Sequence, residues 1–493
     1  LGKIVERRVT TDRSIEHSRE VTMVGIKSYG VYIPYYRLNR AEVAKNWGGF
    51  QMAGEKAVAN FDEDTVTMGV EACRECLKGF DKGNIGALYL TSTTFPYAEK
   101  QSSALVAAVL DLDQSVFTVD VSGTLRCGSS AVRLAMDALK AGSSENTLVC
   151  SSDLRLGLPN GAKELEFGDG AAAFLLGNAD VVATIDNTYT MNHEIFDVFR
   201  PAQERFVRSW EDRFAREVGY IEVVSEAARA ALKAFGMEPG DFAKAVFGSP
   251  NPVYLSGAAK AAGFDPKVQA VDPLWGMIGN TGSAHALILL CAALDEAKPG
   301  DRLLWVNYGD GCDVFALTVT DEVAKMQKRQ SVKRLLNSKA QTTYQKYMRW
   351  RELIALEPPM RPRTEPASAV ALYRDRKCGL ALNGSKCKNC GTIQYPVQRV
   401  CMECRAKDNF DFYPFADKQG KVVTFSHDNL AVSPDPPTTL AAVDFEEGGR
   451  IMMDITDRDP SQITVGMPLE MTFRKFRRTD GVQVYWWKSR PIR

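Results

Sequence analysis

These 493 residues exceed what one ordinary hydrophobic core holds, so two or three domains are expected. Lysine plus arginine equals aspartate plus glutamate at 61 each, which argues against nucleic acid or an anionic membrane as a partner. The chain has no apolar run of membrane-spanning length, residues 1–22 lack the apolar core of a signal peptide, and the 11 cysteines fit a reducing compartment, so we expect a cytoplasmic protein.

Composition and patterning divide the chain into segments. Strand-like and helix-like patterns alternate from Val24, which predicts a layered α/β domain made of two halves. After Thr320 the chain becomes charged and helical and then rich in proline, as in a linker. The predicted boundaries are an extension at 1–22, the two halves at 23–178 and 179–325, the linker at 326–368, and two small modules at 369–410 and 411–493.

Early in the first half, the pattern at 64–79 predicts a helix with small and apolar residues on one face, and the pattern at 85–93 predicts a buried strand. Cys73 and Cys76 form a Cys-x2-Cys pair inside that helical pattern. No second pair lies nearby, which indicates packing and not a metal site.

The stretch at 118–142 places a cysteine at a turn between a strand and a helix. The alternation in TVDV predicts a short strand, and apolar residues at helical spacing from Ser129 to Gly142 predict the helix. The positive end of that helix would favour a thiolate at Cys127, the form that attacks a carbonyl carbon. A second interpretation stays open, in which Cys127 is a small buried residue at a tight turn.

A repeat relates the two halves of the α/β domain. It pairs FGDGAAAFLLG at 167–177 with YGDGCDVFALTV at 308–319, and the helix opened at Gly128 with a helix opened at Gly282. Two similar halves predict a pseudo-twofold domain with a site where the matching loops meet.

The GDG turns, IGNTGSA at 278–284, VFGSPNP at 246–252 and the loop around Cys127 together resemble the thiolase superfamily, and most closely the archaeal and bacterial hydroxymethylglutaryl-CoA synthases. The resemblance covers roughly residues 23–320. It implies a five-layer αβαβα fold, a dimer, and an acyl-CoA substrate whose pantetheine enters a narrow tunnel.

The same resemblance exposes three departures at the expected catalytic positions. Such synthases use an acylated cysteine, a glutamate acid or base, and a histidine that assists the second substrate. A gap-free alignment places Leu125, Thr93 and Gly248 at these positions, and none of them supplies the missing chemistry. Asn251 and Asn280 are retained, and the resemblance implies that they orient a thioester carbonyl or its bound water.

Two kinds of chemistry would compensate for these losses. RCGSS resembles the thiolase motif Cys-Gly-Ser-Gly, so a shift of two residues would make Cys127 the acyl acceptor, although the helix register favours Leu125. Alternatively, an aldol-type cleavage needs only a base and an oxyanion site beside Asn280. The candidates for that base are Tyr308, His285, Cys312 and Asp310, of which His285 and Cys312 taken singly are more simply structural residues.

Four arginines lie among aromatic residues at 199–220, where the pattern predicts a helix. They would either contact CoA phosphates or form a solvated face. They are Arg200, Arg205, Arg208 and Arg213.

The first small module contains four cysteines with Cys-x2-Cys-x10-Cys-x2-Cys spacing. Two such pairs supply four thiolates to a tetrahedral zinc ion and leave no open position, so the spacing predicts a closed structural site in a rubredoxin-like zinc ribbon and not a hydrolytic one. The predicted ligands are Cys387, Cys390, Cys401 and Cys404.

After the cysteine module, short alternating strands separated by Gly, Pro and Asp turns predict a small antiparallel barrel of OB type. A zinc ribbon followed by an OB barrel resembles the acyl-CoA-associated domain that accompanies thiolases as a separate protein, here fused. OB folds also bind oligonucleotides, but the neutral charge makes that the weaker interpretation.

The sequence therefore predicts an acyl-CoA protein that makes or breaks a carbon–carbon bond next to a CoA thioester, as an acyltransferase or C–C lyase or a subunit of one. Its partners would be the acyl-CoA and a second copy or another thiolase-like chain. The alternatives are a catalytically silent scaffold and a retro-aldol enzyme without an acyl-cysteine. The site candidates are Cys127, Asn280 and Tyr308 for catalysis and Asn251 and His285 for substrate binding. The acyl group has no readable signal.

Overall fold

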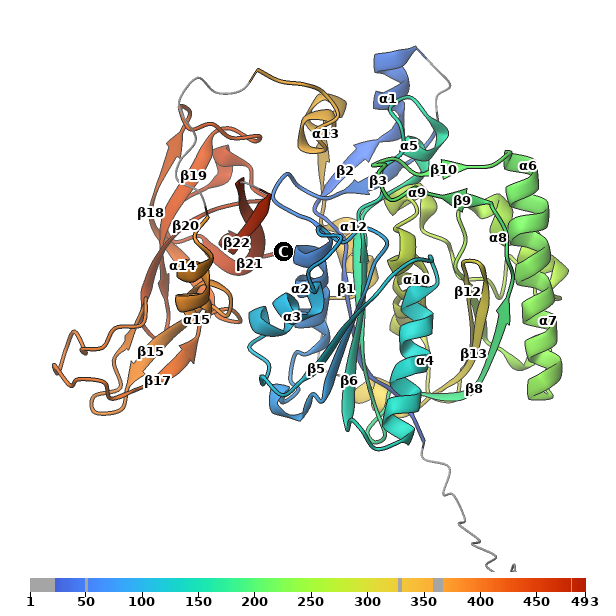
Figure 1. The fold of residues 1–493 in the computed structure, drawn as a ribbon, viewed down its shortest axis with the longest axis horizontal. Helices are drawn as coiled ribbons and strands as arrows, with labels where there is room; N and C mark the ends of the chain where they lie inside the picture. Colours follow the sequence, from blue (N-terminus) through green and yellow to red (C-terminus); the bar gives the residue numbers. More distant parts are fainter. Residues whose placement is uncertain (1–22, 49–51, 327–329, 358–366, 480) are drawn as a thin grey trace, which may run out of the picture.

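The computed structural model describes residues 23–48, 52–326, 330–357, 367–479 and 481–493. The predicted extension at 1–22 and part of the predicted linker, 358–366, lie outside the described residues. The chain builds a large α/β domain and a smaller β-rich module that lies against one side of it (Figure 1). Within the described ranges, every helix is too short or too polar to cross a membrane.

The first half of the α/β domain is a five-stranded sheet in the order β5-β4-β6-β7-β1. β4 (Ala87–Thr91) lies parallel to β5 (Phe117–Val121) and to β6 (Asn146–Asp153). β7 (Gly170–Gly177) runs antiparallel to β6 and to β1 (Gly25–Tyr32). β4 and β7 are buried along their whole length, because helices cover both faces of the sheet.

The second half repeats this arrangement in the order β11-β12-β13-β8. A parallel bridge between Ala245 and Ala270 occupies the place beside β11 that β5 occupies beside β4. A short pairing of β1 with β8 joins both halves into one nine-stranded sheet, and the predicted duplication is confirmed. The strands are β8 (Ala183–Asn192), β11 (Lys244–Phe247), β12 (Arg302–Tyr308) and β13 (Gly311–Val319).

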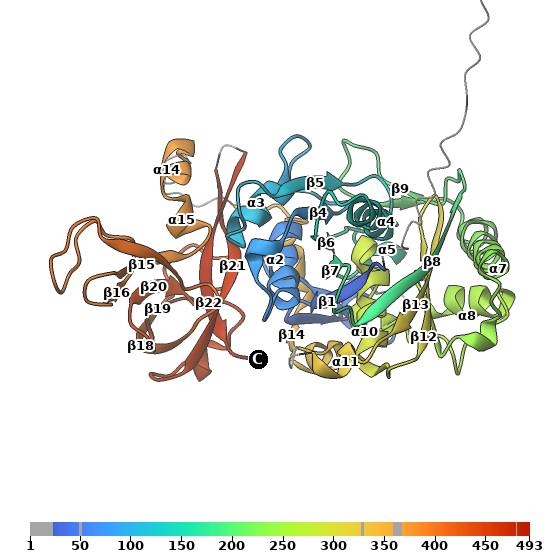
Figure 2. The ribbon, with the colours of Figure 1, turned by 90° about the horizontal axis from the view of Figure 1, so that it is seen from below.

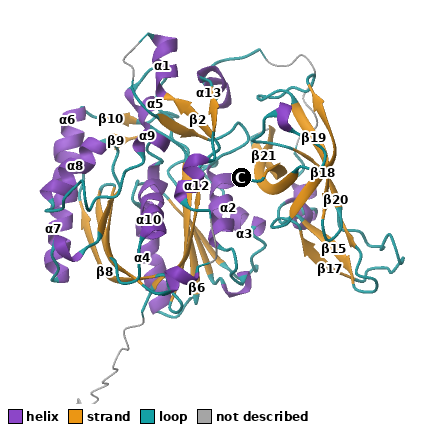
Figure 3. Cartoon of the chain, turned by 180° about the vertical axis from the view of Figure 1, so that it is seen from behind, coloured by secondary structure: helices purple, strands orange, loops and turns teal. Residues whose placement is uncertain are grey.

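Three layers of helices alternate with the two halves of the sheet. The central layer holds α4 (Cys127–Lys140) and α10 (His285–Glu296), which contact β6 and β7 on one side and β11 and β12 on the other (Figures 1 and 3). The outer layers are α2 (Thr65–Cys76) with α3 (Ser102–Val109), and α7 (Val223–Phe235) with α8 (Pro252–Ala261). This order confirms the five-layer αβαβα fold.

Helix α2 is buried on nearly every side because it lies between the sheet and the C-terminal module. Asp64 caps it by accepting from the Thr67 backbone N–H at 3.0 Å, while the Thr67 hydroxyl accepts from the Asp64 N–H at 2.8 Å. Cys73 and Cys76 are fully buried in it, so their interpretation as packing residues is confirmed.

Part of the predicted linker returns to the α/β domain. β14 (Ala340–Thr342) pairs in parallel with β2 (Tyr36–Asn39), and Trp350 of α13 (Tyr344–Trp350) packs against Tyr36 with ring centroids 5.0 Å apart and a tilt of 59° between the ring planes. The other short elements of the α/β domain and of the chain up to the ribbon are α1 (Arg40–Trp47), β3 (Glu55–Val58), η1 (Lys82–Asn84), α5 (Ala162–Glu166), β9 (Val198–Phe199), β10 (Arg208–Ser209), α6 (Asp212–Phe214), a π-helix (Ala215–Glu222), η3 (Pro239–Asp241), α9 (Trp275–Ile278), η4 (Gly282–Ala284), α11 (Glu322–Lys325), α12 (Val332–Asn337), α14 (Ala369–Arg374) and α15 (Arg376–Gly379).

The C-terminal module consists of a three-stranded ribbon and a five-stranded barrel. In the barrel the strands follow the order β20-β19-β18-β21-β22, and a parallel bridge from Ile455 to Ser489 brings its two ends together. The ribbon strands are β15 (Asn383–Cys387), β16 (Ile393–Gln394) and β17 (Phe410–Pro414), and the barrel elements are β18 (Gln419–Asp428), β19 (Thr438–Phe445), β20 (Arg450–Asp454), η5 (Pro460–Gln462), β21 (Pro468–Thr479) and β22 (Val482–Pro491).

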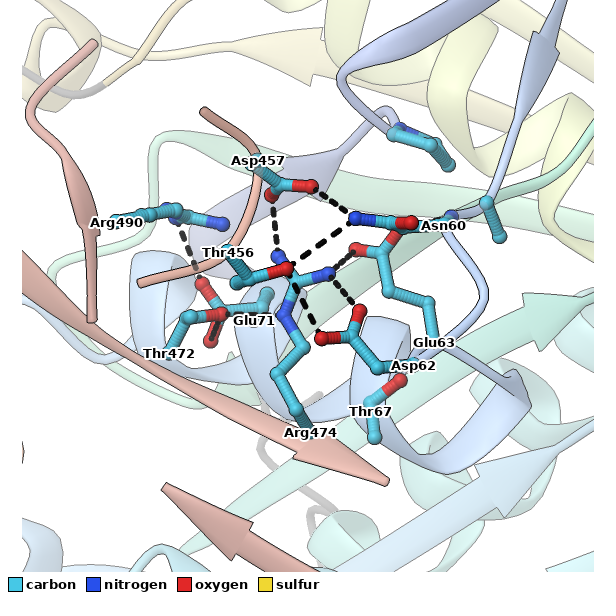
Figure 4. A network of polar contacts seen from close by, with 12 residues as sticks. Asn60, Asp62, Glu63, Thr67, Glu71, Thr456, Asp457, Thr472, Arg474 and Arg490 are labelled. Atoms are coloured by element: carbon cyan, nitrogen blue, oxygen red, sulfur yellow. Dashed lines mark hydrogen bonds and ion pairs between the residues drawn. The ribbon is translucent and has the colours of Figure 1, made fainter. Parts of the chain in front are cut away.

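The barrel docks on the α/β domain through β21, which lies against α2 (Figure 2). One apolar cluster runs from α2 into the barrel, and Phe473 and Trp487 are among its fully buried members. Beside it, Arg474 lies fully buried among three carboxylates, as Figure 4 shows: Asp62 at 3.2 Å, Glu63 at 2.8 Å and Asp457 at 2.6 Å. Two of these belong to the α/β domain, so the network crosses the junction.

Candidate active site and metal centre

A cavity of about 200 Å³ opens at the carboxyl ends of β4, β5, β6 and β12. Ligands of open α/β sheets bind at such strand ends. Loops from both halves form its wall, as the repeat predicted. The lining residues are Thr93, Ser122, Gly123, Thr124, Leu125, Arg155, Asp197, Val198, Phe199, Arg200, Val207, Tyr308, Gly309 and Asp310.

The turn before α4 presents Leu125 to the cavity and hides Cys127. Gly123 has φ +98°, which lets the chain reverse between β5 and α4. Cys127 is the first residue of α4, is fully buried and does not line the cavity. Burial raises the pKa of Cys127 to about 12. Of the two interpretations left open for Cys127, the structure therefore supports the small buried residue at a tight turn and not the thiolate, because desolvation of the thiol outweighs the positive end of the helix.

Thr93, which the resemblance places at the glutamate position, donates its hydroxyl to Asp153, 3.0 Å from the nearer carboxylate oxygen. Asp153 is fully buried, and it also accepts from the Ser92 hydroxyl at 2.7 Å and from the Ser283 backbone N–H at 2.8 Å. This carboxylate therefore ties the loop after β4 to the start of α10, and Thr93 serves the framework of the site.

Gly248, which the resemblance places at the histidine position, has no room for a side chain. A Cβ atom there would lie 2.8 Å from the Ala286 Cβ and 2.9 Å from the Asn307 Oδ1. The side chains of Ala286 and Asn307 fill the space that a histidine would need, so packing disfavours a histidine at this position.

Three other predicted site residues lie away from the cavity wall. Asn280 is buried, and its Oδ1 accepts from the Gly282 N–H at 2.9 Å. Asn251 caps α8. His285 lies with its Nδ1 3.2 Å from the Thr281 hydroxyl, and burial lowers its pKa to about 4, so the ring is neutral near pH 7. The visible contacts of all three are with the protein itself.

Of the alternative bases, Tyr308 and Asp310 line the cavity, and Tyr308 is paired with an aspartate. The Tyr308 hydroxyl donates to the Asp197 Oδ2 at 2.7 Å, and both residues are more than nine-tenths buried, at 7% and 9% exposure. The Val198 N–H donates to the other Asp197 oxygen at 2.5 Å. Burial raises the pKa of Asp197 above its ordinary value and raises the pKa of Tyr308 as well. Cys312, by contrast, is fully buried, and burial raises its pKa.

Asp197 was missed at the level of sequence. It is the only acid in the apolar run at 195–199, and that run carries no spacing that marks a site. Its partner Tyr308 comes from the end of a strand 111 residues away, so only the fold brings the pair together.

The predicted helix at 199–220 is confirmed only from Asp212 onward and is wrong for residues 199–211. β9 and β10 form a two-stranded hairpin there, and helical structure begins only at α6. Pro201 disfavours the helical conformation at the residue before it, and the Trp210 N–H donates to the Asp197 carbonyl instead. Of the four arginines, only Arg200 lines the cavity, and its Nη2 donates to the Thr93 carbonyl oxygen at 2.5 Å.

The ribbon brings its four predicted cysteine ligands together. The four Sγ atoms lie within 4.8 Å of one another, with Cys387 and Cys404 3.6 Å apart and Cys390 and Cys401 3.6 Å apart. Tetrahedral zinc with bonds of about 2.3 Å requires sulfur–sulfur separations of roughly 3.8 Å, so the donor set fits. Each Cys-x2-Cys pair closes a turn. The N–H of the residue that follows the second cysteine, Gly391 or Arg405, donates to the carbonyl oxygen of the first cysteine.

Replacing Cys390 with serine should remove the zinc and unfold the ribbon, since four thiolates hold the ion and folding of such ribbons is coupled to binding. Metal analysis should find one zinc per wild-type chain and a small fraction of that in the variant. Cys378→Ser is the matched control, because Cys378 lies outside the four-cysteine cluster. Equal zinc contents in the wild type and in Cys390→Ser would contradict the assignment.

Comparisons with known proteins agree with this structure. The chain is 34% identical over 314 residues to the hydroxymethylglutaryl-CoA synthase of Methanocella arvoryzae, covering 62% of this chain and 90% of that protein. It is 33% identical over 347 residues to the synthase of Methanosarcina mazei, covering 68% and 99%.

Solved structures and family descriptions cover both bodies of the protein. An HMG-CoA synthase complexed with CoA superimposes with a TM-score of 0.60 at 18% identity, covering 66% of this chain and 90% of that one. MvaS in complex with 3-hydroxy-3-methylglutaryl coenzyme A gives 0.57 at 22% identity, covering 70% and 95%. Residues 381–410 match the ChsH2 rubredoxin-like zinc ribbon domain, and residues 413–474 match the ChsH2 C-terminal OB-fold domain. The chain thus belongs to the hydroxymethylglutaryl-CoA synthase family and carries a ChsH2-type zinc ribbon and OB barrel behind its synthase-like domain.

Proposed function

We propose that this chain binds an acyl-CoA thioester in the cavity and cleaves, or in reverse forms, the carbon–carbon bond next to the thioester without an acyl-cysteine. The observation that carries the proposal is the Tyr308–Asp197 pair on the wall of a cavity whose nucleophile position is Leu125. The relatives that match this chain are synthases of a 3-hydroxyacyl-CoA, and a retro-aldol cleavage is the reverse of their bond-forming step.

In the cleavage direction, the 3-hydroxyl group of the substrate gives its proton to the Tyr308 oxygen as the Tyr308 proton moves to Asp197. The bond between C2 and C3 breaks, C3 becomes a carbonyl carbon, and the electron pair stays on C2 as a thioester enolate. The enolate then takes the proton back from the pair at C2, which releases a shortened acyl-CoA and restores both side chains.

The enolate oxygen needs a positive environment while the bond is broken. α4 begins at Cys127, two residues after Leu125, so the positive end of a 14-residue helix lies beside the cavity. Acyl transfer through a cysteine would need a reactive thiol on the same wall, and the buried Cys127 thiol with its raised pKa does not provide one.

The test combines turnover with intact-mass spectrometry. Wild-type protein should release a shortened acyl-CoA and a carbonyl product from 3-hydroxyacyl-CoA thioesters without acquiring an adduct. Leu125→Cys places a thiol in the cavity and should gain one acetyl group from acetyl-CoA, whereas the surface control Leu134→Cys, on α4, should not. A wild-type adduct that disappears in Cys127→Ala would establish acyl-cysteine chemistry and overturn the proposal.

A scaffold role is the second candidate, because all three family catalytic positions have lost their side-chain chemistry. A scaffold would purify with a catalytic thiolase-like chain. For this chain alone we infer a homodimer through β5, an edge strand that no described strand pairs on its outer side, with Phe117 61% exposed. Light scattering should give twice 54.4 kDa. A second polypeptide in equal amount would support the scaffold.

A further inference from the structure

The π-helix at Ala215–Glu222 packs against the Tyr308–Asp197 pair. It joins α6 to α7 without a break at the outer side of the α/β domain (Figure 1), so one helical segment runs from Asp212 to Phe235. In a π-helix each N–H bonds the carbonyl five residues back, an uncommon arrangement that is frequent at functional sites. Tyr308 and Asp197 line the cavity and no residue of the π-helix does, so the pair separates the π-helix from the cavity.

Gly219 brings the backbone of the π-helix against both residues of the pair. A Cβ atom added there would lie 3.3 Å from the Asp197 Cβ and 3.5 Å from the Tyr308 hydroxyl oxygen. The first distance is shorter than the best separation of two carbon atoms, so a side chain at this position would displace Asp197. Glycine is otherwise disfavoured inside a helix, and here it leaves room for the pair.

The next residue, Tyr220, holds the ring of Tyr308. Tyr220 is 1% exposed, and its ring meets the Tyr308 ring edge to face, with centroids 5.2 Å apart and an angle of 73° between the ring planes. On its other side, Tyr220 packs against Tyr254 of α8, with ring centroids 5.7 Å apart. Tyr220 therefore fixes the Tyr308 ring, while Gly219 leaves space beside the Tyr308 hydroxyl.

The helix geometry explains how neighbouring residues make these contacts. Besides Gly219 and Tyr220, Ile221 also packs inward, because a Cβ added to Gly257 of α8 would come within 2.6 Å of the Ile221 Cδ1. In an α-helix each residue is rotated by about 100° from the one before it, so the outer two of three consecutive residues lie about 200° apart. The wider turn of a π-helix reduces this angle, which lets all three residues contact the domain at once.

We propose that Gly219 and Tyr220 are positioning residues, which hold the Tyr308 hydroxyl on Asp197 at the observed distance of 2.7 Å. This inference rests on the proposed function of the cavity. The two residues act through the pair and not on the substrate, since neither lines the cavity. Proton transfer requires donor and acceptor within hydrogen-bonding reach, and a displacement of about 1 Å lowers a rate by about 10²-fold.

The test measures kcat and KM separately for cleavage of a 3-hydroxyacyl-CoA. Gly219→Val should lower kcat by about 10²-fold, and Gly219→Ala, whose single methyl group needs a smaller shift, should lower it less. KM should change by no more than about twofold, because the cavity wall keeps all its residues. Tyr220→Leu should also lower kcat at unchanged KM, whereas Tyr220→Phe keeps the ring and should restore most of the wild-type kcat.

Gly257→Ala is the matched control, since its added methyl group meets the Ile221 side chain of the same π-helix and not the pair. Its kcat should stay within a factor of about two of the wild-type value. A wild-type kcat in Gly219→Ala and Tyr220→Leu, or an equal loss in Gly257→Ala, would overturn the proposal. These two variants also decide if circular dichroism shows that Gly219→Val does not fold.

Crystal structures supply a second measurement, which does not depend on turnover. The Tyr308 hydroxyl oxygen and the Asp197 Oδ2 should lie within hydrogen-bonding distance in the wild type and more than about 3.5 Å apart in Gly219→Val. An unchanged distance in the variant would overturn the positioning role. If the wild type cleaves no 3-hydroxyacyl-CoA, the proposed function fails, and this distance alone decides whether the π-helix positions the pair.

Discussion

Replacing Tyr308 with phenylalanine, or Asp197 with asparagine, is expected to lower kcat for cleavage of a 3-hydroxyacyl-CoA by about 10²- to 10⁴-fold, the usual contribution of a positioned acid or base. The phenylalanine loses the oxygen that takes the substrate proton, and the asparagine cannot take a proton from Tyr308. KM should change little, because the hydroxyl acts in the transition state and not in binding. The double variant should be no slower than the worse single variant, since the two groups form one relay.

The pH profile tests the assignment of Asp197 as the final proton acceptor. Burial raises the pKa of Asp197, and the reaction needs its carboxylate form. The rate should therefore fall as pH drops through this raised pKa, at a pH above the value of about 3.9 typical of an exposed aspartate. This fall in rate at low pH should be absent from the residual activity of Asp197→Asn.

Tyr254→Phe is the matched control, because it removes a tyrosine–aspartate hydrogen bond of 3.1 Å, to Asp212, outside the cavity. It should leave kcat within a factor of about two, as expected for a group that does not touch the reacting atoms. Full activity in both Tyr308→Phe and Asp197→Asn would remove the pair from the mechanism.

The sequence was informative about this site where it predicted the path of the backbone, through its strands and glycine turns. The resemblance places Leu125, Thr93 and Gly248 at the expected catalytic positions because the strands and glycine turns around them are local patterns. It was uninformative about Asp197. This residue belongs to a loop after a strand, and no short-range spacing relates its side chain to Tyr308, 111 residues away. It left Cys127 undecided between a thiolate and a buried residue, because helix position was visible in the pattern and burial was not.

The fold was predictable for a similar reason. The GDG repeat revealed two halves, and the cysteine spacing revealed the ribbon, because each is a local pattern. The junction between the α/β domain and the barrel was invisible. Arg474 and its three carboxylates come from distant parts of the chain, and each alone reads as an ordinary surface charge.

Removing the Arg474 side chain, as in Arg474→Ala, should destabilise the protein by about 3 to 5 kcal/mol, the usual cost of leaving buried charges uncompensated. Asp62, Glu63 and Asp457 would then lie together without their central cation. Since two of these carboxylates belong to the α/β domain, the loss of stability should be greatest where the barrel contacts that domain. Urea unfolding followed by tryptophan fluorescence should show the barrel separating at lower denaturant than the α/β domain.

The junction should also be sensitive to acid. Although burial alone would raise the pKa of Asp457, the guanidinium groups of Arg474, Arg493 and Arg490 hold it well below its usual range. A depressed pKa contributes stability that is present above the unfolded value of about 3.9 and is lost as pH falls below it. Wild-type protein should lose stability in acid by this route, and Arg474→Ala should lose less because its stabilising pair is already absent.

The control for Arg474 is an ion pair of the same chemistry on the surface. Arg399 bonds Asp408 through two nitrogens, at 2.8 and 2.7 Å, with both side chains largely exposed. Arg399→Ala should therefore cost less than about 1 kcal/mol, because water already solvates both charges. If the two variants lost the same stability, burial would not govern the network and the barrel would be held to the α/β domain by its apolar contacts alone. A much larger loss in Arg474→Ala would establish the buried charges as a determinant of how the fused module is attached.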